Sequence, residues 1–185
     1  MLDTVKIPES IGQYLAGFAD GEGSFNVSFR PRGDYCQPWK ISLCFNVSQR
    51  DKVVLTLFMQ HLECGTMRQR ADGVWYYEAN SLDVIRGHVI PFFERFGFLS
   101  DKKRRDFAKF RELADLMARR RHLSKDGVLE ILEIRREMND GGKRRYTDDQ
   151  ILTRFGSGES SETVRRTPSE SEMRQSELHG DMQSG

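Results

Sequence analysis

The sequence predicts an α+β fold in which an antiparallel β-sheet carries helices on one face and further helices follow at the C-terminal end. Two long stretches alternate apolar and polar residues with a period of two, which is typical of half-buried strands. The order helix, strand, strand occurs twice before a closing helix, so the predicted topology is αββαββα. With 185 residues, the chain is long enough for one domain with a substantial core.

The first predicted element is a helix over residues 10–20, SIGQYLAGFAD, in which apolar residues recur every three to four positions. It ends in ADGEG, residues 19–23, which places carboxylates at the negative pole of the helix beside carbonyls that lack partners. A surface turn explains such a sequence, since Gly tolerates positive φ and Glu22 is then solvated. A divalent cation also explains it, because carboxylate and carbonyl oxygens are the ligands that Mg²⁺ prefers.

Small residues also mark this helix. They stand at three- and four-residue spacings and let a second helix backbone approach closely, but they equally suit packing against a sheet. Both interpretations stay open. The candidates for a helix–helix interface are Gly12, Leu15, Ala16 and Ala19.

Strands are predicted next, over residues 24–30 and 40–49, each with an apolar and a polar face. A helix over residues 51–62 follows. Two shorter strands, 65–70 and 74–79, are joined by an Ala-Asp-Gly turn. Because the four strands come in two hairpin-like pairs, we expect them to form one antiparallel sheet whose uncovered face is polar and basic.

The remaining predicted elements are helices. One starts after Ser81 and runs to the region of Pro91, and a long amphipathic helix spans roughly 101–120. Two more, at about 125–138 and 147–155, complete the domain. These last two are the extra C-terminal helices of the predicted fold.

Residues 156–185 differ from the rest in composition, being rich in Ser, Glu and Gly. Their six acids outnumber three arginines, so the first 155 residues carry a net charge of +4, although the whole chain has only +1. We therefore expect a single domain over residues 1–155 and a flexible tail after it.

Cysteine and histidine usage gives no sign of a zinc site or a disulfide framework, because the three cysteines lack CxxC spacing and the four histidines do not cluster. This usage fits a reducing compartment. No apolar run approaches the roughly 20 residues that span a bilayer, and no signal-peptide core is evident. We expect no membrane association and an intracellular protein, in a bacterial cytoplasm or an organelle.

The stretch LAGFADGEG, residues 15–23, resembles the signature of the LAGLIDADG homing endonucleases. It occurs once, as in the homodimeric, group I intron-encoded branch of that family. Four later stretches resemble the same branch in order: FNVSQRDK, RQR, FLSDKKRRDFAKF and NDGGKRRYT. The resemblance covers about residues 9–155. It implies a Mg²⁺-dependent enzyme that hydrolyses both strands of a long, pseudo-palindromic DNA target at a specific site.

The resemblance also implies roles for single residues. Two copies of the first helix would pack across a twofold axis, and Gly21 and Glu22 of each would bind the metal. The catalytic residues would be Glu22, Gln49 and Lys102, with Lys103 as an alternative to Lys102. Glu22 stands where Asp is commoner in the family, one methylene longer, and Asp20 is expected to be structural.

A sheet that lies in the major groove presents alternate side chains to base edges. The candidates for this contact are Asn26, Ser28, Arg30, Arg32, Tyr35, Lys40, Ser42, Asn46, Arg68, Arg70, Trp75 and Tyr77. A sheet face that is merely soluble is the alternative. The late basic cluster Lys143, Arg144 and Arg145 suits phosphates, whereas the runs at 119–121 and 135–136 fit either phosphate contact or a solvated helix face.

Two other functions remain as alternatives: an RNA-binding intron maturase, and a DNA-binding protein of the same fold that does not cleave. The set of Glu22, Gln49 and Lys102 favours the nuclease, because a protein that only binds does not need the acid.

Overall fold

A computed structural model describes residues 1–33, 38–141 and 144–156. Its elements, in chain order, are η1 (Thr4–Lys6), α1 (Glu9–Glu22), β1 (Gly23–Pro31), β2 (Trp39–Gln49), α2 (Val53–Leu62), β3 (Thr66–Gln69), β4 (Trp75–Ala79), α3 (Leu82–Val84), η2 (Ile85–Val89), α4 (Ile90–Phe96), α5 (Asp101–Ala118), η3 (Arg121–Leu123), α6 (Lys125–Glu137), η4 (Asn139–Gly141) and α7 (Asp148–Gly156). The predicted α+β class and the αββαββα order with extra C-terminal helices are confirmed. Apart from Gly156, the predicted tail lies outside the described residues.

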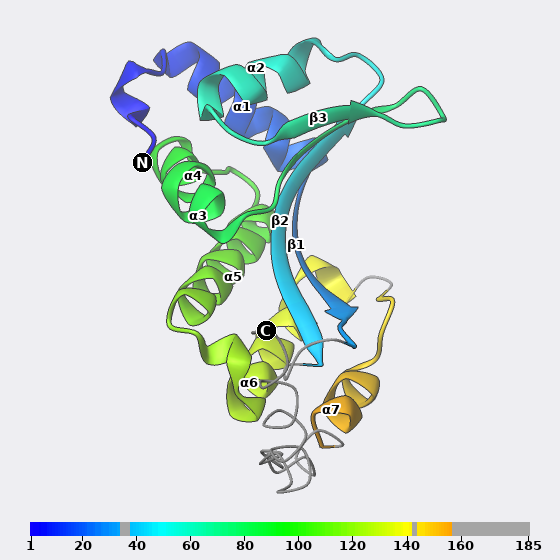
Figure 1. The fold of residues 1–185 in the computed structure, drawn as a ribbon. Helices are drawn as coiled ribbons and strands as arrows, with labels where there is room; N and C mark the ends of the chain where they lie inside the picture. Colours follow the sequence, from blue (N-terminus) through cyan, green and yellow to red (C-terminus); the bar gives the residue numbers. More distant parts are fainter. Residues whose placement is uncertain (34–37, 142–143, 157–185) are drawn as a thin grey trace, which may run out of the picture.

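The four strands form one antiparallel sheet in the order β1-β2-β4-β3. β1 and β2 pair along their whole lengths, from Gly23 opposite Val47 to Pro31 opposite Trp39. β4 pairs only with the last five residues of β2, from Phe45 to Gln49. The β1–β2 hairpin therefore extends beyond the other two strands, as a long ribbon (Figure 1).

Helices lie along one side of this ribbon and at its two ends (Figure 1). α3, α4 and α5 lie beside it, α1 and α2 lie at the end where β1 begins, and α6 and α7 lie at the opposite end (Figure 1). α7 is held there by Trp39, whose indole Nε1 donates to the Ile151 carbonyl at 3.0 Å. Trp39 also packs edge-on against Tyr146, with ring centroids 4.9 Å apart.

An aromatic cluster fills the space between sheet and helices. Phe25 of β1 is fully buried, and its ring centroid lies 5.2 Å from that of Phe45, 5.6 Å from Phe93 and 4.9 Å from Phe110. These four residues come from β1, β2, α4 and α5, so one side chain joins four elements. Burying a Phe stabilises the fold by about 2–3 kcal/mol, which makes this cluster the centre of the core.

The helix predicted to end near Pro91 instead continues to Phe96, through the π-helical turn η2 into α4. Pro91 has no N–H, so the carbonyl four residues earlier, that of Gly87, loses its helical donor. The backbone N–H of Leu2 takes this place and donates to the Gly87 carbonyl at 2.7 Å. Because the freed carbonyl is satisfied from outside, the helix runs past its proline.

Candidate nucleic-acid interface and catalytic centre

The end of α1 is a direct transition from helix to strand. Glu22 is the last residue of α1 and Gly23 is the first of β1, and the Gly23 N–H donates to the Ala19 carbonyl. A Cβ atom at Gly23 would lie 2.7 Å from that carbonyl oxygen, so only glycine fits where the strand leaves the helix. The exposed Glu22 carboxylate is thereby fixed at the C-terminal pole of α1.

Asp20 ties this end of α1 to the start of α5. Its carboxylate accepts hydrogen bonds from the Leu99 N–H at 3.2 Å, the Ser100 N–H at 2.9 Å and the Ser100 hydroxyl. Partial burial raises the pKa of Asp20, but these hydrogen bonds and the charge of Lys103 outweigh it and lower the pKa below its ordinary value. The structural role expected for Asp20 agrees with these contacts.

Lys103, and not Lys102, lies beside the end of α1. The Lys103 ammonium is half-buried and donates to the Gly23 carbonyl. Burial lowers its pKa, against the opposing influence of the carboxylates of Asp106, Asp20 and Glu22. The positively charged group is therefore held within the electric field of Glu22.

The catalytic role predicted for Lys102 stays a prediction, because its side chain makes a different contact. Its ammonium pairs with the Asp140 carboxylate at 2.5 Å, and that hydrogen bond and charge raise the pKa of Lys102. Consecutive residues of a helix point about 100° apart, so only one of the two lysines can face α1. The first turn of α5 orients Lys103 that way.

Gln49 ends β2, two residues after Val47, the strand partner of Gly23. Its position has the same parity as Val47, so it lies on the helical face of the sheet at the edge nearest the end of α1. The half-buried side chain uses its Oε1 to accept from the Arg50 N–H at 2.9 Å. Its predicted catalytic role stays a prediction.

The oxygen donors at this end of α1 are suited to a hard cation. They are one carboxylate, that of Glu22, and the carbonyl of Gly21, and the described residues contain no group of three or more His, Cys, Asp or Glu placed to hold a metal. Mg²⁺ is usually bound by one or two carboxylates together with phosphates and water. The donor set therefore fits Mg²⁺ if a phosphate completes the coordination.

The polar face of the long hairpin points away from the helices, as predicted. Its residues are Ser24, Asn26, Ser28 and Arg30 on β1 and Lys40, Ser42, Cys44, Asn46 and Ser48 on β2. Arg30 lies directly opposite Lys40, and both are exposed. Like charges opposite one another destabilise a sheet, and an anion bound between them would reverse this effect.

Two predicted contacts on β4 are wrong, because Trp75 and Tyr77 face the helices. Tyr77 is fully buried, and its hydroxyl donates to the Cys64 carbonyl at 3.1 Å. Burial strongly raises the pKa of Tyr77. Trp75 is half-buried against the core, with the Lys52 ammonium 5.5 Å from its ring centroid. Neither side chain is available to a base edge.

Tyr76 occupies the outward position that the sequence analysis gave to its neighbours. It pairs with Ser48 of β2 and Arg68 of β3, and the Arg68 guanidinium lies 5.2 Å from its ring centroid. Partial burial, with nearby Cys44 and Glu78, raises the pKa of Tyr76 to about 12. The sequence signal for this register is Ala79, which is buried. A small apolar residue at this position indicates the core-facing side of β4, and the aromatic residues two and four positions before it share that side.

The other predicted contacts divide by position. Arg68 and Arg70 are exposed and pair with Glu78 at 3.8 Å and Asp72 at 3.4 Å. Arg32 is exposed at the end of the hairpin. Arg144 and Arg145 lie near the β1 edge. Tyr35 and Lys143 lie outside the described residues.

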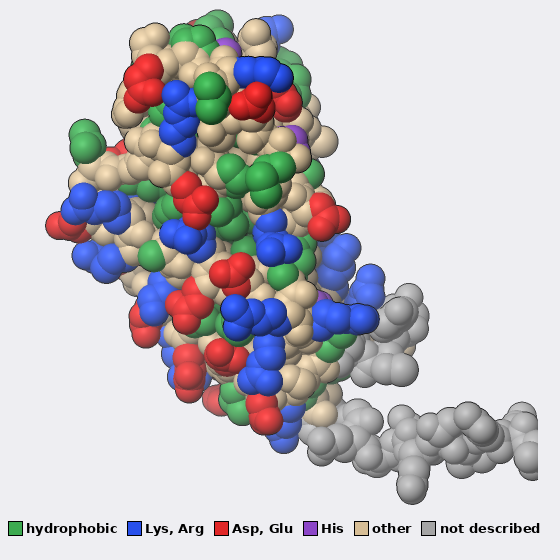
Figure 2. Space-filling model, turned by 90° about the vertical axis from the view of Figure 1, so that its left-hand side faces the viewer, with side chains coloured by type: hydrophobic (Ala, Val, Ile, Leu, Met, Phe, Trp, Pro, Cys, Tyr) green, Lys and Arg blue, Asp and Glu red, His purple; other side chains and the backbone are tan. Residues whose placement is uncertain are grey.

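The helical side of the molecule has a different charge pattern. Figure 2 shows Lys and Arg side chains interspersed with Asp and Glu over this side. Arg111 pairs with Glu94 at 2.9 Å and Lys109 with Glu137 at 2.8 Å, for example. Such mixed charge is typical of a solvated surface and gives a polyanion no preferred track.

Within the described residues, no helix is both long and apolar enough to cross a membrane.

The predicted interface residues of α1 face the chain's own core. Leu15, Ala16 and Ala19 are at most 2% exposed, and a Cβ at Gly12 would lie 2.2 Å from the Phe96 ring. These four residues therefore pack within one chain, and their assignment to a helix–helix interface is wrong. The small residues follow the core-packing alternative.

The opposite side of α1 is open. Gly17 and Gly21 are exposed, and a Cβ at either would meet no atom within 4 Å. Tyr14, at 50% exposure, lies on the same side. The glycines stand four residues apart, a spacing that lets another helix backbone come close.

Asp106 and Asn139 were not singled out from the sequence. Asp106 is buried on α5 and accepts from the Asn139 N–H at 3.0 Å. The Asn139 amide donates to the Phe25 carbonyl at 2.8 Å, and Asn139 and Asp140 both have φ near +50°. Asn and Asp tolerate this left-handed conformation better than most residues, which is the one sequence signal that marks the turn.

The family model described as LAGLIDADG endonuclease matches residues 15–114. A Neurospora crassa protein named "Probable intron-encoded endonuclease 2" is 27% identical over 132 residues, which make up 69% of this chain and 29% of that protein. The chain thus spans less than a third of the length of that relative.

Solved structures share the fold. The crystal structure of a homing endonuclease, I-TnaI, is 29% identical with a TM-score of 0.68, over 80% of this chain and 97% of that one. The meganuclease I-SmaMI bound to uncleaveable DNA is 27% identical with a TM-score of 0.67, over 71% of this chain and 45% of that one. The chain therefore corresponds to nearly all of the first protein and to under half of the second.

Proposed function

The chain belongs to the LAGLIDADG endonuclease family, and from this premise we propose that it is a site-specific endonuclease that cuts both strands of a DNA duplex. It acts as a homodimer with Mg²⁺ and reads a long target through the outward face of its sheet. One observation carries the proposal: α1 brings the Glu22 carboxylate, and α5 the Lys103 ammonium, to the same end of the hairpin whose outward face is polar.

The chemistry of the site follows from these groups. A divalent cation held by the Glu22 carboxylate and the Gly21 carbonyl would act as a Lewis acid at the scissile phosphate and the leaving 3′ oxygen. Lys103 presents an N–H donor in a half-buried position, where a hydrogen bond to a charged phosphate oxygen is stronger than in water. Gln49 orients a water molecule through its amide.

The outward face of the hairpin supplies the reading surface. Asn26, Ser28, Ser42 and Asn46 present amides and hydroxyls that distinguish base edges in the major groove. Arg30 and Lys40 at the far end meet phosphates or guanines. Because each strand turns every second residue to this face, a hairpin of this length reaches several consecutive base pairs.

Two copies are needed because each chain offers a single Glu22, whereas a double-strand break requires two cuts. The chain spans 97% of one solved homing endonuclease and 45% of another, so the longer protein has room for two such units. We place the contact between copies on the open side of α1, at Gly17 and Gly21. A twofold dimer then matches a pseudo-palindromic target.

An RNA-binding maturase and a DNA-binding protein without cleavage remain the rival functions. The Glu22 carboxylate argues against both, because a carboxylate repels a nucleic acid unless a cation lies between them. Lys103 beside it supplies the charge that cleavage needs. No contact among the described residues favours either rival.

A cleavage experiment tests the proposal. The full chain is incubated with a randomised duplex library and Mg²⁺, and the cut ends are sequenced. We expect recurrent ends that define one pseudo-palindromic site, with both strands cut. Glu22→Gln keeps the shape of the exposed side chain and is expected to bind the recovered site without cutting it. Equal cutting by wild type and variant would refute the role of Glu22, and binding of the library without any cutting would favour the rivals.

A further inference from the structure

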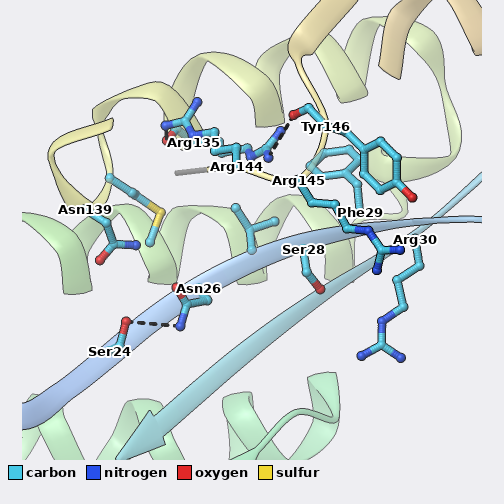
Figure 3. A pocket seen from close by; sticks show the side chains of 12 residues that line it. Ser24, Asn26, Ser28, Phe29, Arg30, Arg135, Asn139, Arg144, Arg145 and Tyr146 are labelled. Atoms are coloured by element: carbon cyan, nitrogen blue, oxygen red, sulfur yellow. Dashed lines mark hydrogen bonds between the residues drawn. The ribbon is translucent and has the colours of Figure 1, made fainter. Parts of the chain in front are cut away.

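A groove of about 510 Å³ runs along the β1 edge of the sheet. One wall is β1 itself, with Asn26, Ser28 and Arg30, and the other is the segment 144–146 that leads into α7 (Figure 3). Arg30 and Arg145 are both exposed, one on each wall. The groove is thus lined by cations and by hydroxyl and amide groups, which suits the backbone of a nucleic-acid strand.

Arg135 of α6 holds the second wall in place. Arg135 is 7% exposed, and its guanidinium stacks over Phe29 of β1 at 4.9 Å from the ring centroid. The Nη2 atom donates to the Tyr146 carbonyl at 3.5 Å, and Nη1 lies 3.5 Å from the Asp148 carboxylate. One side chain therefore contacts the strand, the segment 144–146 and the first residue of α7.

The main chain of Arg135 adds a further contact, because its carbonyl accepts a hydrogen bond from the Arg144 guanidinium. Arg144 is thus directed inward, whereas Arg145 lies over the Tyr146 ring at 5.5 Å and stays exposed. Tyr146 is in turn packed against Trp39. Arg145 is therefore presented by a segment that is fixed from behind.

The energetics of Arg135 point to positioning. Its Nη1 is buried without a hydrogen-bond partner and lies at an ion-pair distance from Asp148. A buried charge with incomplete partners stabilises a fold little, and an apolar side chain of similar size often serves stability better. A guanidinium is a fork whose two Nη atoms contact Tyr146 and Asp148 at the same time. An apolar side chain cannot make these two contacts.

We propose that Arg135 is a positioning residue for DNA binding: it fixes the segment 144–146 so that Arg145 meets a phosphate of the strand lying on β1, without touching DNA itself. This inference rests on the proposed function. It assigns Arg135 a role that differs from both earlier interpretations of the 135–136 run, which were a solvated helix face and a direct phosphate contact.

The test uses the salt dependence of binding. The full chain is titrated with a mixed-sequence 30-bp duplex in EDTA, over a series of KCl concentrations, and the slope of log K against log[KCl] is measured. This slope is negative, and each lost phosphate contact reduces its magnitude by about 0.9. We expect this loss for Arg145→Gln and the same loss for Arg135→Met. Arg111→Gln, on the helical side, removes an equal charge and is the control with an unchanged slope.

The double variant separates positioning from direct contact. If Arg135 acts through Arg145, Arg135→Met with Arg145→Gln has the slope of either single variant. The inference would be overturned if the magnitude of the slope fell by the sum of the two losses in the double variant. It would also be overturned if Arg135→Met kept the wild-type slope. Should Arg135→Met fail to fold, Arg135→Lys keeps the positive charge but cannot contact Tyr146 and Asp148 together, with the same expected loss and the same contradicting result. Absence of salt-dependent binding by the wild type would instead remove the proposed function on which the inference rests.

Discussion

The two faces of the β1–β2 hairpin differ in every contact that they make, although their residues alternate along the same strands. Phe25 and Phe45 on one face are fully buried among aromatic rings from α4 and α5. The side-chain amides of Asn26 and Asn46 on the other face form hydrogen bonds with neighbours on their own strands, Ser24 and Cys44. Neighbouring residues can therefore be changed to alter stability or recognition separately, and the following predictions test this separation.

The largest contrast is expected between Phe45→Ala and Asn46→Ala. Removing the Phe45 ring leaves a cavity beside Phe25, Phe58 and Phe93, so the free energy of unfolding in urea should fall by about 3–5 kcal/mol. Asn46→Ala should change it by less than about 0.5 kcal/mol, yet weaken binding of the recovered target roughly tenfold or more. Comparable losses of stability in both variants would contradict the separation.

The two lysines at the start of α5 provide the next contrast. Lys103→Met removes the ammonium beside Glu22 and should lower the single-turnover cleavage rate by about 100-fold. Lys102→Met removes only the ion pair with Asp140 and should change the rate by a few-fold at most. Melting temperatures of both variants serve as the control for folding. A larger loss with Lys102→Met would reverse our assignment.

The two sides of α1 are compared by substituting glycines. In Gly12→Ala the new methyl group meets the buried Phe96 ring, and we expect a loss of about 1–3 kcal/mol in the free energy of unfolding. Gly17→Gln fills open space and improves helix propensity by up to about 1 kcal/mol. It should leave the fold intact but dissociate the dimer in analytical ultracentrifugation. A Gly17→Gln variant that stays dimeric would place the contact elsewhere.

A smaller contrast is expected between Tyr77→Phe and Tyr76→Phe. The first leaves the Cys64 carbonyl without its donor and should cost about 1 kcal/mol of stability by chemical denaturation. The second removes an outward hydroxyl and should leave stability within about 0.5 kcal/mol, while affinity for the recovered target falls. If both hydroxyls proved equally important for stability, the register of β4 would need revision.

Asp20 extends the comparison, because it is a polar residue whose hydrogen bonds stabilise the fold. Its pKa is lowered below the ordinary 3.8, so the stability that its ionised form adds is complete above that pH and is lost as the pH falls through the lowered value. We expect Asp20→Ala to cost about 1 kcal/mol at pH 7 and to differ less from wild type in acid. Asp20→Asn, which carries no charge, should show no such pH dependence, and identical pH profiles for wild type and both variants would refute this account.

The sequence was sufficient for the fold and for the transition from helix to strand that places Glu22 at the end of α1. Long strands with strict alternation, such as 40–49, determine which face is buried over many residues, and errors average out. β4 has only five residues, WYYEA, three of them aromatic, so a single step of register exchanged Tyr76 for its neighbours. Lys102 and Lys103 differ only in helical phase, which the sequence alone does not specify.

Other features depend on contacts between distant segments. The small residues of α1 suit close packing on either side, and only the position of Phe96 shows that Gly12 faces inward. Arg135 looks like half of a surface pair with Arg136, but Phe29 and Tyr146 bury it from other parts of the chain. Such residues carry no local pattern that separates them from solvated arginines.

Pro91 makes the helix around it dependent on the far N-terminal segment. Leu2 is buried and its N–H donates to the Gly87 carbonyl, an oxygen to which the proline offers no hydrogen. Replacing Pro91 with an ordinary residue would bring two amides into competition for one acceptor. This substitution would remove a helix-breaking residue, yet it would weaken the packing of residues 2–7 against the outer side of α4.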